Sequence, residues 1–332
     1  MNKNYIKNIS SLKNILLLFS LIIFLIATYI YWYIFLINNS KEQLSIIKKN
    51  FIEKNIYISW NLSKTSGFPY RLENNLNDVI IKYKKQNIFI KNIKLINQPW
   101  KLKHYIIKIN DEIKISNEID NININIQNLV ASYILKENLN FRASIQINKM
   151  IIKHKNSSYT FNKPLLHFRN TSEQDLDYAF LIKNIILPEN IKDLKVKDIN
   201  SKGKILKYKN FYFEKINIIN NSGIDIEKFD ININNDAFTL QGFIGLDNNY
   251  NIISSVSFYS EGMINFLKFL NEKDFISDQL TKACSLVIKA VNISSKLAKE
   301  NPIYTINIQN NYLSFMNIEI FKTPTLKKYF NY

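Results

Sequence analysis

The stretch "SKTSGFPYRLEN", residues 63–74, gathers residue types that are scarce in the rest of the chain. Gly67, Pro69 and Arg71 lie two residues apart, although the 332 residues include only six Gly and six Pro. Glycine permits backbone angles denied to other residues, proline fixes its own φ, and a guanidinium can clamp backbone carbonyls or a carboxylate. These residues therefore predict either a rigid corner or a ligand site built on Arg71.

The corner is the favoured interpretation of this stretch. It would join a strand ending at Trp60 to the main sheet, with a buried Phe68 and a paired Arg71. A ligand-binding role for Arg71 is the alternative. The residues of this candidate site are Trp60, Ser66, Gly67, Phe68, Pro69, Tyr70 and Arg71.

Other groups that could do chemistry are scattered. The three histidines stand alone on strand-like segments, and three carboxylates near a turn show no sign of being a catalytic pair. These residues are His104, His154, His167, Asp225, Glu227 and Asp230. The single Cys284 falls inside an apolar helical stripe, so we expect a buried structural thiol. The chain has no HExxH motif and too few glycines for a phosphate or dinucleotide loop, so we expect no enzyme, no cofactor and no metal site.

The chain is strongly basic, with 44 Lys and Arg against 27 Asp and Glu and a net charge of +17. The lysines are spread along the polar sides of the expected strands and form no basic run, so we expect no nucleic-acid partner. Attraction to acidic lipid head groups would be a secondary effect of about 1 kcal/mol per residue close to the surface.

Residues 15–37, "ILLLFSLIIFLIATYIYWYIFLI", contain no charge over 23 positions. At 1.5 Å per residue this segment can cross a hydrocarbon core of about 30 Å, so it predicts a transmembrane helix. Tyr29, Tyr31, Trp32 and Tyr33 favour the membrane interface. No small-residue cleavage site follows, so we expect an uncleaved anchor.

The orientation of the anchor does not follow from the lysines, which are balanced on its two sides. A short tail precedes the helix and a large domain follows, and long domains can be translocated largely regardless of charge. We therefore expect a cytoplasmic tail at 1–14, a single span of the inner membrane at 15–37, and a periplasmic β-rich domain at 38–332.

The exported part is expected to begin with a short helix at about 40–54, where Ser40 and Gln43 have capping-box spacing. A period of two then dominates, which indicates antiparallel strands with one apolar and one polar face. The strand segments are 56–60, 87–96, 105–116, 120–127, 141–154 and 228–236, with turn signals at 220–223 and 246–251. A helical region is expected at about 261–299, followed by a hairpin at 303–321 around Asn310 and Asn311.

This inventory predicts a mainly β fold: a large antiparallel sheet with a C-terminal helical insertion and an N-terminal transmembrane helix. The many one-faced strands present more apolar surface than the helices can cover. The sheet must therefore close on itself as a sandwich or barrel or stay open as an apolar trough, and the closed sandwich is slightly favoured. An open trough would be a binding surface.

The anchor, the aromatic strand end at Trp60 and the "SGFPYRLE" element at 66–73 resemble the domain of unknown function 2125 family of Gram-negative bacteria. The segment 237–247, the helical stretch after it and the final 308–326 resemble its C-terminal half more loosely. The resemblance implies an anchored envelope protein facing the periplasm, with no established reaction. The outline is also similar to that of the AsmA-like proteins, which are implicated in phospholipid traffic.

Two functions remain open at this point. The first is binding or transfer of lipid or another apolar envelope molecule on the inner face of the sheet. The second is a non-enzymatic structural or scaffolding role that docks other envelope proteins near the inner membrane. A hydrolase would be favoured only if histidines and carboxylates converged in one cleft.

Overall fold

The computed structural model describes residues 3–62, 65–83, 86–117, 122–136, 140–170, 174–189, 194–207, 222–234, 236–247, 249, 251–260 and 262–324. Side chains of the first helix are described from Lys13 onward. The helices are α1 (Lys3–Glu53), α2 (Met263–Glu272) and α3 (Asp278–Ala298). The strands are β1 (Tyr57–Leu62), β2 (Leu72–Tyr83), β3 (Gln86–Gln98), β4 (Lys101–Ile109), β5 (Ile113–Asn117), β6 (Ile122–Leu135), β7 (Phe141–His154), β8 (Ser157–Asn170), β9 (Leu176–Ile186), β10 (Val196–Leu206), β11 (Gly223–Ile233), β12 (Asp236–Leu246), β13 (Ile252–Ser260), β14 (Tyr304–Gln309), β15 (Tyr312–Phe315) and β16 (Ile318–Lys322).

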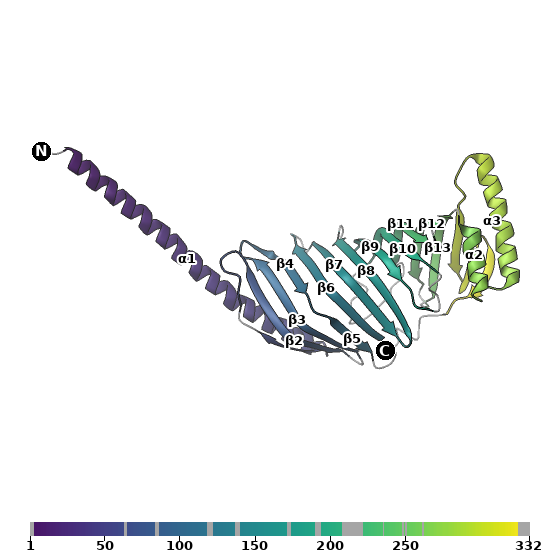
Figure 1. The fold of residues 1–332 in the computed structure, drawn as a ribbon, viewed down its shortest axis with the longest axis horizontal. Coiled ribbons are helices and arrows are strands. Elements are labelled where there is room, and N and C mark those ends of the chain that lie inside the picture. The colour runs from purple at the N-terminus through teal and green to yellow at the C-terminus, as the bar shows by residue number, and fades with distance from the viewer. Residues whose placement is uncertain are drawn as a thin grey trace.

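All the strands form one 16-stranded antiparallel sheet, which confirms the predicted mainly β fold. Each strand pairs with the next along the chain, except that β4 and β5 share the place between β3 and β6. Within the described residues β1 pairs only with β2 and β16 only with β15, so the sheet has two free edges. The favoured closed sandwich of two sheets is therefore wrong. Figure 1 shows one long, twisted sheet with α1 at one end and α2 and α3 at the other.

The predicted transmembrane helix and the predicted short helix at about 40–54 form one continuous helix, α1. The separate helix start at Ser40 is wrong, because residues 37–55 contain no glycine or proline to interrupt the hydrogen-bond ladder. The Ser40 hydroxyl instead accepts a hydrogen bond of 2.7 Å from Asn74 Nδ2 on β2. One 18-residue window of α1 has a mean hydropathy of 2.4 and none of it is buried, so α1 is long and apolar enough to cross a membrane.

The helical region expected at 261–299 consists of two helices, α2 and α3, separated at 273–277. Asp274 has a left-handed backbone (φ 59°), and the Ser277 hydroxyl caps α3 by accepting from the Leu280 N–H at 3.3 Å. Cys284 and Ile288 of α3 are fully buried against the sheet. The expected buried thiol is therefore confirmed, and this burial raises the pKa of the Cys284 thiol.

The predicted hairpin around Asn310 and Asn311 is confirmed, because these residues connect β14 and β15 with φ of 53° and 65°. Two consecutive left-handed residues match the twist of the paired strands. Met316 and Asn317 make a second turn of this kind before β16. The turn predicted at 246–251 connects β12 to β13, whereas residues 220–221 lie outside the described residues.

The packing of α3 on the end of the sheet can be tested through the reactivity of the buried Cys284 thiol. Ile288 is 0% exposed and lies one turn from Cys284, so Ile288→Ala should cost about 2–5 kcal/mol in local stability. We expect the reaction of Cys284 with an aromatic disulfide reagent to become at least about tenfold faster, since each 1.4 kcal/mol changes the open fraction about tenfold.

Leu286→Ala is the matched control for Ile288→Ala, because Leu286 is on the same helix but 68% exposed. The reaction rate of Cys284 in this variant should stay close to that of the unchanged chain. Equal acceleration by the two substitutions would contradict the packing of α3 described above.

Candidate functional site

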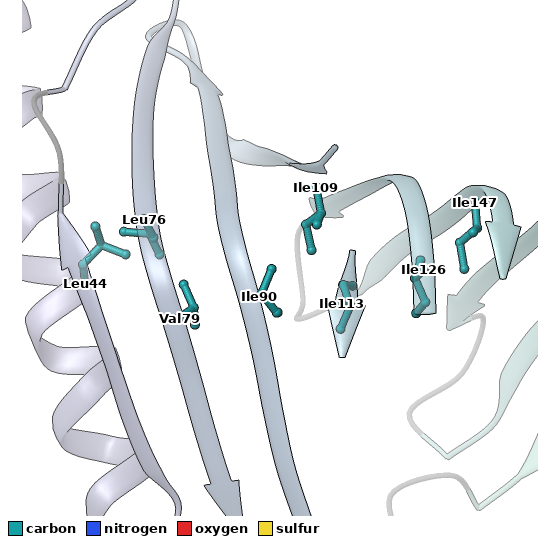
Figure 2. Packing of buried hydrophobic residues seen from close by; sticks show 8 residues of the cluster. All are labelled: Leu44, Leu76, Val79, Ile90, Ile109, Ile113, Ile126 and Ile147. Atoms are coloured by element: carbon teal, nitrogen blue, oxygen red, sulfur yellow. The ribbon is translucent and has the colours of Figure 1, made fainter. Parts of the chain in front are cut away.

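Apolar side chains face one another from strand to strand along one side of the sheet. Ile109 of β4 lies opposite Leu129 of β6, which lies opposite Ile147 of β7. Further along, Leu166 of β8 lies opposite Phe180 of β9. Residues directly opposite in an antiparallel pair share a face of the sheet. We call this surface the apolar face, and Figure 2 shows its first part as a row of buried side chains from β2 to β7, with Leu44 of α1 at its end.

The apolar face continues through a point in the long strands where the in–out alternation of side chains shifts by one residue. Leu76 and Val79 of β2 are three residues apart, which would place them on opposite faces of a regular strand, yet both are buried in one cluster. Asp78 between them has a left-handed backbone (φ 51°), as does Asn128 between Ile126 and Leu129. Each such residue resets the alternation as a β-bulge does, so apolar residues on both sides of it stay on the same face.

Helices cover the apolar face only at its two ends within the described part of the chain. Leu44 of α1 packs on the first strands, and Met263 and Leu267 of α2 with Ile288 of α3 pack on the last ones. Figure 1 shows no helix over β7 to β10. Most side chains in this middle part are half-buried, and among the described residues only neighbouring strands shield them.

Aromatic rings lie in the uncovered middle part. The ring of Phe180 is 6.4 Å from Tyr178 and 6.3 Å from Phe229, between ring centroids. The Tyr178 hydroxyl lies 3.3 Å from the Ser201 Oγ, and desolvation by burial raises the pKa of this tyrosine. The uncovered middle part therefore presents aromatic rings on the apolar face, and nothing in the described residues covers them.

A hollow of about 210 Å³ lies where the uncovered part meets α2. All its lining side chains are apolar, among them Phe229, Ile231 and Leu240 from the sheet and Met263 and Phe266 from α2. The lining of this hollow offers water no hydrogen-bond partner and suits a hydrocarbon chain.

A second hollow, of about 340 Å³, lies at the strand ends on one side of the uncovered part. Charged residues line it together with the backbone of β8 to β10. Arg142 lies opposite Arg169, and Arg169 forms an ion pair of 2.9 Å with Asp177. We call this place the charged rim, and it lies on the opposite face of the sheet from Phe168 and Tyr178, because Arg169 and Asp177 alternate with them along β8 and β9.

The stretch predicted as a corner does form one. The Ser66 and Glu73 backbones exchange hydrogen bonds of 3.0 and 2.8 Å, and the Arg71 N–H donates to the Gly67 carbonyl at 3.0 Å. Gly67 has a φ of 102°, and a Cβ there would lie 2.5 Å from the Arg71 carbonyl oxygen, so only glycine fits. The Phe68–Pro69 peptide bond is cis. Trp60 lies apart from these residues, with Lys48 Nζ of α1 5.6 Å from its ring centroid.

This corner packs on the second half of the apolar segment of α1. The Tyr29 hydroxyl donates to the Pro69 carbonyl, and the Tyr33 hydroxyl donates to the Arg71 carbonyl at 2.9 Å. The Phe68 ring lies 5.0 Å from that of Tyr33 in an edge-to-face arrangement. Sequence reasoning took the tyrosines of α1 only as interface residues, and their spacing of four was the signal of a shared helix face.

The structure corrects one detail of the corner and explains another. Phe68 was expected to be buried but is 53% exposed, because its ring packs on Tyr29 and Tyr33 of α1 and the rest of it stays open. Arg71 has the expected ion pair, in which its Nε lies 2.5 Å from Glu73 Oε1. Lys94 Nζ of β3 lies 3.3 Å from the other oxygen of this buried carboxylate, so two cations balance one desolvated charge.

The remaining candidates do not converge. His104 Nε2 lies 3.0 Å from Ser132 Oγ, His154 is at the end of β7, and His167 Nδ1 is buried without a partner beside the charged rim. The three carboxylates follow one another along β11, where Asp230 is paired with Lys228 at 2.9 Å. No cluster of three metal-binding side chains occurs within the described ranges. No family model, curated protein or solved structure matches the chain.

Gly67→Ala tests whether the corner is held as described. The substitution forces a left-handed backbone on alanine and a clash with the Arg71 carbonyl, at a cost of about 1–2 kcal/mol or more. We expect trypsin to cleave the Arg71–Leu72 bond about tenfold faster in the detergent-solubilised chain, as followed by mass spectrometry. Ser66→Ala is the control, because the corner uses only the backbone of Ser66, and equal cleavage of the two variants would refute this role of Gly67.

Proposed function

We propose that this chain is a single-pass membrane protein that binds lipid or another apolar envelope molecule on its apolar face and passes it along the sheet. One observation carries the proposal: the apolar face is continuous between α1 and α2 and its middle is uncovered within the described residues. Soluble proteins rarely leave a contiguous apolar patch of more than several hundred Å² exposed to water. An apolar ligand is the simplest occupant of such a surface.

The dimensions of the sheet support transfer over a distance. The path from β1 to β16 includes 15 strands, and neighbouring strands lie about 4.8 Å apart, which gives a contour of roughly 65–70 Å. This contour exceeds the hydrocarbon thickness of one bilayer, about 30 Å. An acyl chain that entered near α1 could therefore move well beyond the membrane surface on the same face.

The apolar face supports an occupant with hydrocarbon chains. The aromatic rings of Tyr178, Phe180 and Phe229 and the apolar hollow beside α2 would hold the tails of a lipid. The Arg142 and Arg169 side chains point to the other face of the sheet, so the proposal assigns them no contact with this lipid. Binding of this kind needs neither a cofactor nor a catalytic group.

The proposal includes a location. The domain after α1 would lie in the periplasm and α1 in the inner membrane, with residues 1–14 in the cytoplasm. The apolar segment of α1 supports the anchor, and the ease with which large domains are translocated supports the side. The evenly spread lysines favour acidic lipid surfaces over nucleic acid as a partner.

Scaffolding is the second candidate, and the free edge of β16 favours it. The described part of β16 pairs only with β15, so its outer backbone groups are available to an added strand. A partner protein could dock there by strand addition without using the apolar face.

Photocrosslinking distinguishes the two candidates. A photoreactive amino acid in place of Phe180, in the uncovered middle of the apolar face, should crosslink to lipid in intact cells. The same amino acid in place of Val130, on the opposite face of β6, is the control and should crosslink to lipid far less. Mass spectrometry of the adducts gives the readout.

Equal lipid labelling at the two positions would contradict lipid binding by the apolar face. A specific protein adduct at position 180 would favour the scaffolding function and show that a partner covers the face.

A further inference from the structure

We propose that the corner at 66–71 is itself a membrane-binding element, which inserts Phe68 and Tyr70 into the interface between lipid head groups and acyl chains. The inference depends on α1 crossing a bilayer and is independent of what the apolar face binds. The partner of the corner would be the same bilayer that holds α1.

The corner lies along α1 where a membrane-spanning segment would end. The last charge before the apolar segment is Lys13, and a hydrocarbon core of about 30 Å takes up about 20 helical residues. The core would therefore end near Ile34. Tyr29 and Tyr33, which bind the corner, lie just before that limit and about 6 Å apart along the helix axis. A segment that packs on them must lie at the depth of the interface.

The aromatic side chains of the corner are exposed. Phe68 is 53% exposed and Tyr70 is 73% exposed, although both belong to a well-ordered turn. Tyr31 on the neighbouring turn of α1 is also exposed. In water these rings would leave apolar area unburied, whereas at the membrane interface amphipathic rings are favourable. The exposure of Phe68 suits a corner at the membrane interface better than one surrounded by water.

The polar backbone groups of the corner are hydrogen-bonded, as a position beside lipid requires. Non-helical backbone is tolerated at membrane depth only if its polar groups are satisfied by protein or water. In the corner, the Tyr29 hydroxyl satisfies the Pro69 carbonyl, and Tyr33 satisfies the Arg71 carbonyl. The Ser66–Glu73 pair and the bond from Arg71 to Gly67 satisfy further groups. Two hydroxyls from the membrane helix thus reduce the cost of placing this turn beside lipid.

The charge of Arg71 also fits the lipid interface. The ion pair with Glu73 uses Nε of Arg71, and the Arg71 side chain stays 59% exposed. Its terminal nitrogens can therefore reach lipid phosphate while Phe68 and Tyr70 lie deeper. Aromatic residues below a guanidinium match the order of chemistry across a lipid interface.

The test places a nitroxide label at position 70 of the full-length chain in nanodiscs of phosphatidylethanolamine and phosphatidylglycerol. Cys284 is the single cysteine, so a Cys284→Ala background with Tyr70→Cys gives one label. Power saturation compares collisions with oxygen, which enters the bilayer, and with a water-soluble nickel chelate. We expect a severalfold higher oxygen-to-nickel ratio at position 70 than at Phe275→Cys, a 65% exposed aromatic position between α2 and α3.

Tyr29→Phe provides the second measurement, because it removes one hydroxyl and leaves the ring. The label at position 70 should then become more accessible to the nickel chelate, since the corner loses a hydrogen bond to α1. A ratio at position 70 equal to that at Phe275→Cys would overturn the proposal. So would protection from both reagents, which would indicate a protein partner, or spin–spin broadening that increases with chains per disc, which would indicate a second copy.

Discussion

An antiparallel strand keeps one apolar face only if its alternation stays in phase with that of its neighbours, because a slip of one residue reverses every side chain. In this sheet the alternation of side chains shifts by one residue in the middle of the long strands. The constraint is still met, because neighbouring strands shift at the same level. Leu76 lies opposite Ile93 and Val79 lies opposite Ile90, so β2 and β3 change phase at the same level. Ile126 and Leu129 of β6 keep the same relation to β7. A change of phase in one strand alone would expose half of its apolar residues.

The constraint on phase explains why the sheet can be long and still lack a closed core. Each strand depends mainly on its two neighbours, as in repeat proteins, so the stability of the middle part is a sum of neighbour interactions. The two clusters of buried hydrophobic residues lie toward the ends, one with Leu44 of α1 and one around Ile288 of α3. Two covered ends therefore frame a middle part that can stay open without being unfolded.

Much of the fold could be predicted from local pattern, and the rest could not for identifiable reasons. The period of two in "NININIQ" predicts a one-faced strand, and Asn310–Asn311 predicts a hairpin, because both signals are local. The continuity of α1 through Ser40 was missed, because capping-box spacing also occurs inside helices and the hydroxyl bonds to Asn74, which is distant in sequence. The choice between trough and sandwich depends on how far strands curve, and no local pattern records that. Two adjacent polar residues, such as Gln127–Asn128, mark the level where the alternation of apolar and polar residues shifts by one position. This shift could have been predicted from such pairs, although a search for a period of two alone does not find it.

In the corner, tyrosines that suit the end of a membrane-spanning segment also hold the sheet to α1. Tyrosines near the end of a transmembrane helix usually place their hydroxyls in the head-group region, where water or lipid accepts their hydrogen bonds. Tyr29 and Tyr33 donate instead to carbonyls that lie about 40 residues later in the chain. Because α1 is 51 residues long and 13–53 contain no glycine or proline, it cannot bend readily after its apolar segment. These hydrogen bonds therefore fix the first long strand to a rigid helix, and the start of the apolar face is held at a set place along α1.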